Sequence, residues 1–186
     1  MQRRLKQTRW PSHSAPDGWI AGTDQAWLKE LVGYWAHSFD WRAQEERINQ
    51  YPQFMIDFPE TRMQYLHIPG EGESPYPLLV LHGWPGSIFE FEKIIPMLTQ
   101  PSRFGGKRSE AFTLVVPNLP GFGPSFRQGQ GGLSFNQMGE VLSRLMTHCL
   151  GYKTFGVQGG DLGATIASTM SIRGAGAVAG DRKSVV

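Results

Sequence analysis

The order of hydrophobic and polar residues divides the chain into an N-terminal part with helical periodicity and a longer part with short apolar runs. In the first part, Thr23 is placed to cap a helix. A second short helix is predicted to begin at Asp40 and to end before Pro52, which has no amide donor. The apolar residues of the first predicted helix follow helical spacing: Trp27, Leu28, Leu31, Val32 and Trp35.

From residue 62 onward, four apolar runs have the length and composition of strands. They read RMQYLHI, PLLVLHG, FTLVVPNL and KTFGVQG, at residues 62–68, 77–83, 112–119 and 153–159. Because amphipathic stretches separate most of these runs, the pattern predicts a largely parallel sheet covered by helices.

Two amphipathic stretches carry the S-x-x-E/Q signature of a helix start. The first begins with the pair Ser87 and Glu90, and Pro96 is expected to kink or shorten it. The second begins with the pair Ser134 and Gln137 and is expected to end at Gly151. Apolar residues share one face in the first stretch (Ile88, Phe91, Ile95, Leu98) and in the second (Met138, Val141, Leu142, Leu145, Met146, Cys149).

Composition narrows the class of protein. The 186 residues are 40% hydrophobic and 18% charged, which indicates a globular chain with a substantial core. The net charge of +2, without a dense basic run, argues against a nucleic-acid partner. The single cysteine, Cys149, excludes an intrachain disulfide and favours a reducing compartment, so we expect a cytoplasmic protein.

The sequence gives no evidence for a targeting segment, a membrane span, a cofactor site or a metal site. The basic N-terminus has no apolar run behind it, so we expect neither a signal peptide nor a membrane span in this chain. The stretch GFGPSF lacks the third glycine of a dinucleotide fingerprint, and no histidine or cysteine cluster has metal spacing. We therefore expect no cofactor and no metal.

Tryptophan is concentrated at the start of the chain. Five of the six tryptophans lie within the first 41 residues. Neither predicted helix could bury them alone. We interpret the cluster as core packing against the following domain rather than as a ligand-binding aromatic cage.

The stretch FGVQGGDLGATIA places Asp161 where a predicted strand turns into helix-compatible residues. Gly159 and Gly163 flank Asp161 at minus two and plus two, which suits a sharp strand-to-helix turn that exposes a catalytic side chain. The helix start beyond it favours a carboxylate and leaves free amides for developing negative charge. The alternative is an ordinary turn in which the aspartate caps the helix.

Several stretches occur together and in a fixed order: TRWP, YWAHSFDWRAQEERINQYPQF, HGWPGSIFEFEKIIPMLT, PNLPGFGPS and QGGDLG. Through them the chain resembles the microsomal-type epoxide hydrolases. The resemblance implies an incomplete α/β-hydrolase fold, with a mostly parallel sheet and helices on both faces, preceded by an aromatic-rich helical extension. The extension would span residues 1–60, and the N-terminal part of the core would span residues 61–180. We expect residues 181–186 to be a non-native tail.

The resemblance also implies a site. Asp161 would be the nucleophile, and the backbone amides of Trp84 and Leu162 would form an oxyanion hole. The remaining matched motif residues would have structural roles: His82, Gly83, Pro85, Gly159 and Gly163. A small-molecule epoxide would react with water to give a vicinal diol through an ester of Asp161. The oligomeric state is left open.

The sequence departs from the family pattern after Asp161. No histidine follows it, and no tyrosine follows Tyr152, so the acid, the histidine base and the lid are expected to be missing and the chain to be an inactive fragment. We also expect the strand before Asp161 to lack a neighbour on one side. We interpret the final DRKSVV as a translated sequencing adapter joined to an incomplete gene, the alternative being a natural divergent tail.

Two other functions stay open. A haloalkane dehalogenase also uses an aspartate at this turn, but Leu162 stands where such enzymes typically have a tryptophan, and the N-terminal extension also argues against this class. A non-catalytic fragment or binding protein would fit the missing base and lid.

Overall fold

The computed structural model describes residues 1–12, 18–173 and 177–184. These form two compact units, residues 1–47 and residues 48–186. We describe each unit by itself.

The first unit is helical. It contains α1 (Gln2–Lys6), a 3₁₀ turn (Gly18–Ala21), α2 (Gln25–His37) and most of α3 (Trp41–Ile48). The expected cap at Thr23 is wrong by one residue, because the Asp24 carboxylate accepts the Trp27 amide at 2.8 Å. The expected start of the second helix is confirmed, since Asp40 accepts the Ala43 amide at 3.1 Å.

Four of the five tryptophans of this unit keep much of their surface exposed, and Trp10 is half-buried. Trp19 is 59% exposed, Trp27 45% and Trp35 46%, and the rings of Trp19 and Trp27 lie 5.2 Å apart. Their expected packing against the following domain stays a prediction.

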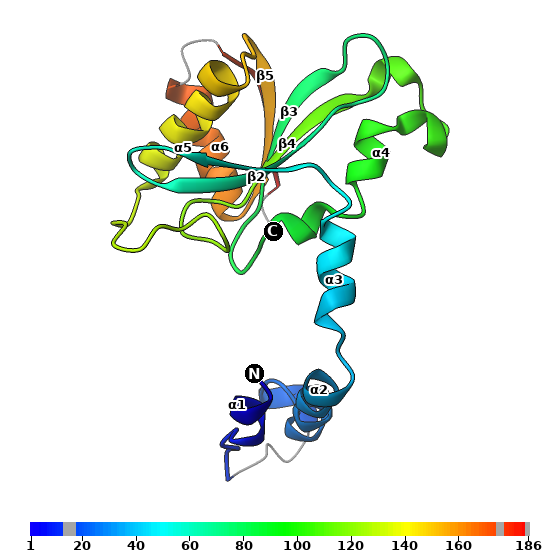
Figure 1. Cartoon of the computed structure of the whole chain (residues 1–186), viewed down its shortest axis with the longest axis vertical. Coiled ribbons are helices and arrows are strands. Elements are labelled where there is room, and N and C mark those ends of the chain that lie inside the picture. Colours follow the sequence, from blue (N-terminus) through cyan, green and yellow to red (C-terminus); the bar gives the residue numbers. More distant parts are fainter. Residues whose placement is uncertain (13–17, 174–176, 185–186) are drawn as a thin grey trace. The chain divides into compact units, whose positions relative to one another are not determined.

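The second unit is built on one six-stranded sheet with the order β1-β2-β4-β3-β5-β6 (Figure 1). β1 and β2 are antiparallel, β2 and β4 are antiparallel, and the other three pairings are parallel. The strands are β1 (Gln53–Asp57), β2 (Arg62–Ile68), β3 (Tyr76–Leu81), β4 (Phe112–Pro117), β5 (Phe155–Gly160) and β6 (Val178–Ser184). The mostly parallel sheet expected from the sequence is confirmed.

Successive residues of the central strands alternate between two cores. Helices α5 (Phe135–Arg144) and α6 (Leu162–Arg173) cover one face, where Leu79, Leu81 and Val115 are buried. Helix α4 (Ile95–Thr99) covers the other face, over Val80 and Leu114 (Figure 1). Burial on both faces explains why these strands are apolar throughout rather than at alternate positions.

The first predicted amphipathic stretch is divided into two short helices. Its capping box is present, because Ser87 and Glu90 start the 3₁₀ helix η2 (Ile88–Phe91). Pro96 then stands in the first turn of α4, where its missing amide costs no helical bond, so the predicted shortening is confirmed. Further short 3₁₀ helices, η3 (Pro101–Phe104) and η4 (Arg108–Glu110), lead to β4.

The second predicted amphipathic stretch begins and ends as expected but changes its winding on the way. The Ser134–Gln137 capping box is present, and Gly151 has φ +76. After α5 the chain forms a π-helical turn, η5 (Leu145–Cys149). A π turn holds more residues than an α turn, so Cys149 rotates off the apolar face and is exposed, contrary to the predicted pattern.

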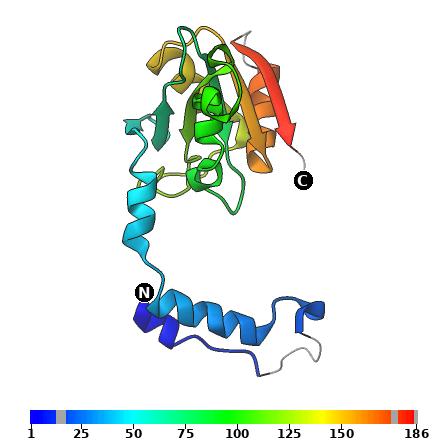
Figure 2. The ribbon, with the colours of Figure 1, turned by 90° about the vertical axis from the view of Figure 1, so that its right-hand side faces the viewer.

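The structure differs from the expected edge beside β5. β6 pairs with it in parallel, so β5 has β3 on one side and β6 on the other, and the expectation of a missing neighbour is wrong (Figure 2). β1 was also not expected. It is largely exposed and pairs only with β2, so it carries none of the alternating burial by which strands are recognised.

Candidate active site

Asp161 occupies a single-residue turn between β5 and α6. Its φ of +50 is the only positive value among the described residues other than glycine. Its backbone carbonyl accepts the amides of Ala164 at 3.1 Å and Thr165 at 3.3 Å, which ties the start of α6 to the turn. This left-handed conformation is uncommon for residues other than glycine, although aspartate adopts it more readily than most.

The two flanking glycines are required by the packing of the turn. A Cβ on Gly159 would lie 2.3 Å from the backbone carbonyl of Gly163. A Cβ on Gly163 would lie 2.4 Å from the carbonyl oxygen of Leu81 at the end of β3. Larger residues would push α6 away from the sheet, so the glycines allow the approach that presents Asp161.

The loop after β3 reaches the same carboxylate. The backbone N–H of Trp84 donates a hydrogen bond to Oδ1 of Asp161 at 2.8 Å. This amide, followed by that of Leu162, lowers the pKa of Asp161 below its ordinary value. The carboxyl group is solvent-exposed and therefore ionised at neutral pH, and two backbone donors converge on it.

His82 lies beneath this loop. It is 1% exposed; its Nδ1 is 2.9 Å from the Gly83 carbonyl, and its Nε2 is 2.9 Å from the Leu119 amide. Burial lowers the pKa of His82, against the opposing effects of the Gly83 carbonyl and of Glu90. Next along the loop, the peptide bond between Trp84 and Pro85 is cis.

A second polar contact holds the loop, and the sequence did not single it out. The Asn118 side chain accepts the Ile88 amide at 3.2 Å and donates to Gln64, whose backbone amide donates to the Ser125 hydroxyl. All three polar side chains are buried. Asn118 was noted only as part of the PNLPGFGPS match, and a polar residue directly after a buried strand is the signal that would have identified it.

Among the described residues, no group of three or more histidine, cysteine, aspartate or glutamate side chains is placed to hold a metal ion. Within those residues, no helix is long and apolar enough to cross a membrane.

Comparison with known proteins identifies the family. The family model described as alpha/beta hydrolase fold matches residues 76–180. The chain belongs to the α/β-hydrolase family. A second family model, described as epoxide hydrolase N terminus, matches residues 1–91.

Individual relatives point to one group within the α/β-hydrolases. Epoxide hydrolase 1 of Oryctolagus cuniculus is 38% identical over 154 residues, which are 81% of this chain and 34% of that protein. The juvenile hormone epoxide hydrolase structure from the silkworm Bombyx mori matches with a TM-score of 0.85 and 30% identity, over 99% of this chain and 48% of that one. The Aspergillus niger epoxide hydrolase structure matches with a TM-score of 0.84 and 25% identity, over 100% and 48%.

The resemblance to epoxide hydrolases expected from the motifs is thereby confirmed. The chain spans less than half the length of these relatives.

Proposed function

We propose that Asp161 is the nucleophile of an epoxide hydrolase and that the amides of Trp84 and Leu162 form its oxyanion hole. The hydrogen bond from the Trp84 amide to Asp161 carries this proposal, because it brings the loop after β3 to the carboxylate at the end of β5. One of the two family models that match this chain carries the epoxide hydrolase name, as do the relatives described above. The substrate class we propose is a small-molecule epoxide.

The first step is a displacement that an ionised carboxylate can perform directly. An Asp161 oxygen forms a bond to a ring carbon of the epoxide, the bond from that carbon to the ring oxygen breaks, and the ring oxygen takes up a proton from water. The product is a hydroxyalkyl ester of Asp161. The lowered pKa of Asp161 keeps the attacking group ionised, so no base is needed for this step.

The second step is hydrolysis of that ester. Water attacks the ester carbonyl, and negative charge develops on an oxygen that the Trp84 and Leu162 amides can stabilise. Breakdown of the tetrahedral intermediate releases a vicinal diol and restores the carboxylate. Water attack needs a base. Because no histidine follows Asp161 in the 186 residues, we propose that this chain forms the ester without turning it over efficiently.

Mass spectrometry of the intact chain tests the proposal. After incubation with styrene oxide, we expect a mass gain equal to one whole epoxide molecule, located by peptide mapping to Asp161. The variant Asp161→Asn should gain nothing. Asp57→Asn is the matched control, because Asp57 is also an exposed carboxylate with a lowered pKa and lies on β1. Circular dichroism establishes that each protein is folded.

The outcomes separate the proposed activities. Equal labelling of wild type and Asp161→Asn, or no labelling of folded wild type, would overturn the assignment of Asp161. With a haloalkane instead of the epoxide, a dehalogenase would gain only the alkyl group and release halide. Halide release without epoxide labelling would replace the epoxide hydrolase by a dehalogenase.

A further inference from the structure

The ring of His82 is held in one protonation state by its two neighbours. The backbone amide of Leu119 can only donate, so His82 Nε2, 2.9 Å away, must accept and carries no hydrogen. The Gly83 carbonyl can only accept, so Nδ1 must carry the hydrogen of the ring. The geometry therefore requires a neutral imidazole with its hydrogen on Nδ1.

This hydrogen bond acts on the peptide group that serves Asp161. The carbonyl of Gly83 and the N–H of Trp84 belong to one planar peptide unit, in which the two bonds point in opposite directions when the peptide is trans. His82 holds the carbonyl end, and Asp161 accepts from the N–H end at 2.8 Å. Fixing the carbonyl on one side therefore fixes the direction of the N–H on the other.

We propose that His82 is a positioning residue whose neutral Nδ1–H form orients the Trp84 amide toward Asp161, and that protonation of His82 releases this orientation. The consequence for catalysis rests on the proposed function. The orientation itself does not, because it concerns only three groups of this chain and their hydrogen bonds.

Protonation would break the arrangement at Nε2. A hydrogen there would face the N–H of Leu119, so one of the two must turn away, and the side chain is 1% exposed with little room to move. The Phe122 ring packs against the imidazole with centroids 5.1 Å apart. Of the charged groups around it, Glu90 favours the protonated form, and Asp161 lies on the far side of the Gly83–Trp84 peptide.

The direction of the pH effect follows from burial. Because burial lowers the pKa of His82, the folded protein binds this proton less readily than the unfolded chain. The oriented state is then complete above the ordinary pKa of 6.5 and is lost as the pH falls through the folded value.

Nuclear magnetic resonance of the whole chain, labelled with ¹⁵N in histidine and tryptophan, tests the proposal without any substrate. We expect His82 to show a protonated Nδ1 and an unprotonated Nε2 at neutral pH. The Trp84 amide resonance should shift with the titration of His82 below pH 6.5. A hydrogen on Nε2 at neutral pH, or a Trp84 amide that ignores the titration, would overturn the proposal.

Three variants separate positioning from simple packing. His82→Phe keeps an aromatic ring but removes both nitrogens, and the Trp84 amide should then exchange with solvent roughly tenfold faster, the equivalent of one hydrogen bond. His82→Asn can still donate to the Gly83 carbonyl and should restore part of this protection. His37→Phe, at the exposed end of α2, is the control and should change nothing. Equal exchange in all three would contradict the proposal.

The same proteins connect orientation to chemistry. Because the Trp84 amide lowers the pKa of Asp161, this pKa should be higher in His82→Phe than in His37→Phe, as a carbon-13 titration of the carboxyl groups measures. Labelling by styrene oxide tests the proposed function in the same samples. If wild type forms no ester, the proposed function fails, and the resonance data alone decide whether His82 orients the amide. If the pKa of Asp161 is the same in both variants, the positioning role fails while the proposed function stands.

Discussion

Gly83 and Asp161 approach so closely that no side chain fits between them. A Cβ on Gly83 would lie 2.7 Å from the Cβ of Asp161 and 2.9 Å from its Oδ1. The loop after β3 and the turn after β5 therefore meet through a residue without a side chain. That contact brings the Trp84 amide within 2.8 Å of the carboxylate.

Replacing Gly83 by alanine should separate the loop from the turn. We expect Gly83→Ala to lower the free energy of unfolding by about 1–3 kcal/mol, as for other overpacked sites. Urea unfolding measures this loss, and labelling by styrene oxide should slow in parallel. Gly131→Ala is the control, because nothing lies within 4 Å of a Cβ there. Similar unfolding curves for the two variants would show that the loop can yield without cost.

Gly163 packs against the end of β3 so closely that a methyl group would not fit between them. Its Cβ would lie 2.4 Å from the carbonyl oxygen of Leu81, a backbone atom that is held within the sheet. We expect Gly163→Ala to destabilise the second unit by about 3 kcal/mol. Gly33→Ala, in the middle of α2 with open space around it, should instead stabilise its helix by about 1 kcal/mol. Thermal unfolding followed by circular dichroism distinguishes a loss from a gain.

The central strands and the helix caps could be predicted because their causes are local. β4 is mostly apolar in sequence because it is buried on both faces, and Ser134 with Gln137 forms a capping box within four residues. Thr23 was preferred to Asp24 because both are capping residues at adjacent positions, and spacing alone does not choose between them.

The contacts of the site depend on the fold and not on local sequence. Trp84 and Asp161 are 77 residues apart, and His82 and Leu119 are 37 apart. Residue types identified Asp161 as a candidate, and resemblance supplied the role of the Trp84 amide. The hydrogen bond from the Leu119 amide to His82 depends on the pairing of β3 with β4, which local sequence does not reveal.

The donor to Asp161 is a backbone group, so the indole of Trp84 should be dispensable for the acidity of Asp161. Trp84 is 69% exposed, and the amide is retained in Trp84→Ala. We expect this variant to keep the pKa of Asp161 below its ordinary value of 3.8. A carbon-13 titration of the aspartate carboxyl groups measures it. A rise of the Asp161 pKa to the ordinary value would mean that the side chain, and not the amide, holds the loop in place.

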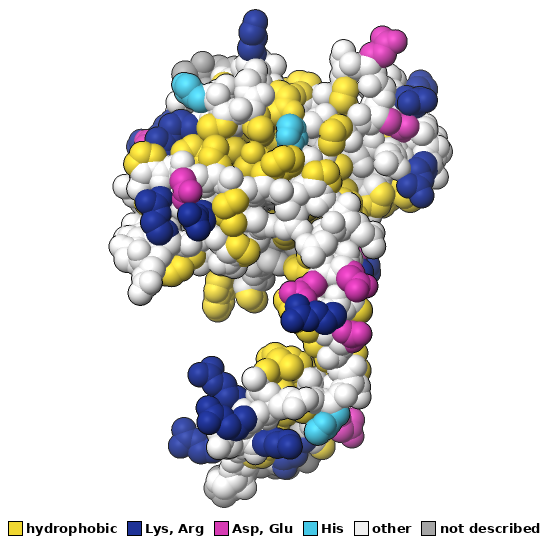
Figure 3. Space-filling model, in the orientation of Figure 1, with side chains coloured by type: hydrophobic (Ala, Val, Ile, Leu, Met, Phe, Trp, Pro, Cys, Tyr) yellow, Lys and Arg dark blue, Asp and Glu magenta, His cyan; other side chains and the backbone are white. Residues whose placement is uncertain are grey.

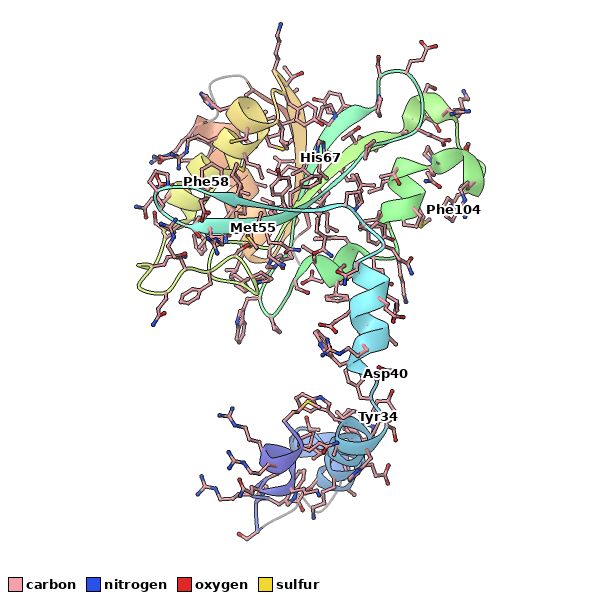
Figure 4. All side chains as sticks on the ribbon, in the orientation of Figure 1. Tyr34, Asp40, Met55, Phe58, His67 and Phe104 are labelled. Carbon is pink, nitrogen blue, oxygen red and sulfur yellow. The ribbon has the colours of Figure 1, made fainter. Side chains whose placement is uncertain are left out.

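His67 should contribute to loss of stability in acid independently of the site. It lies on β2 (Figure 4). Its Nε2 is 2.8 Å from the Tyr152 hydroxyl, and its ring centroid is 6.2 Å from that of Phe54. In Figure 3, hydrophobic side chains gather over the part of the second unit where β1, β2 and α5 lie. Burial lowers the pKa of His67, so the folded state disfavours its charged form.

The stability that the folded protein has while His67 is neutral is complete above pH 6.5 and is lost as the pH falls through the folded pKa of His67. His67→Phe cannot take up a proton, so its free energy of unfolding should fall less steeply between neutral and mildly acidic pH than that of wild type. Some slope should remain, because the pKa of His82 is lowered in the same direction. Urea unfolding at a series of pH values measures both slopes, with His37→Phe as the control. Identical slopes for His67→Phe and His37→Phe would show that His67 titrates alike in the folded and unfolded chain.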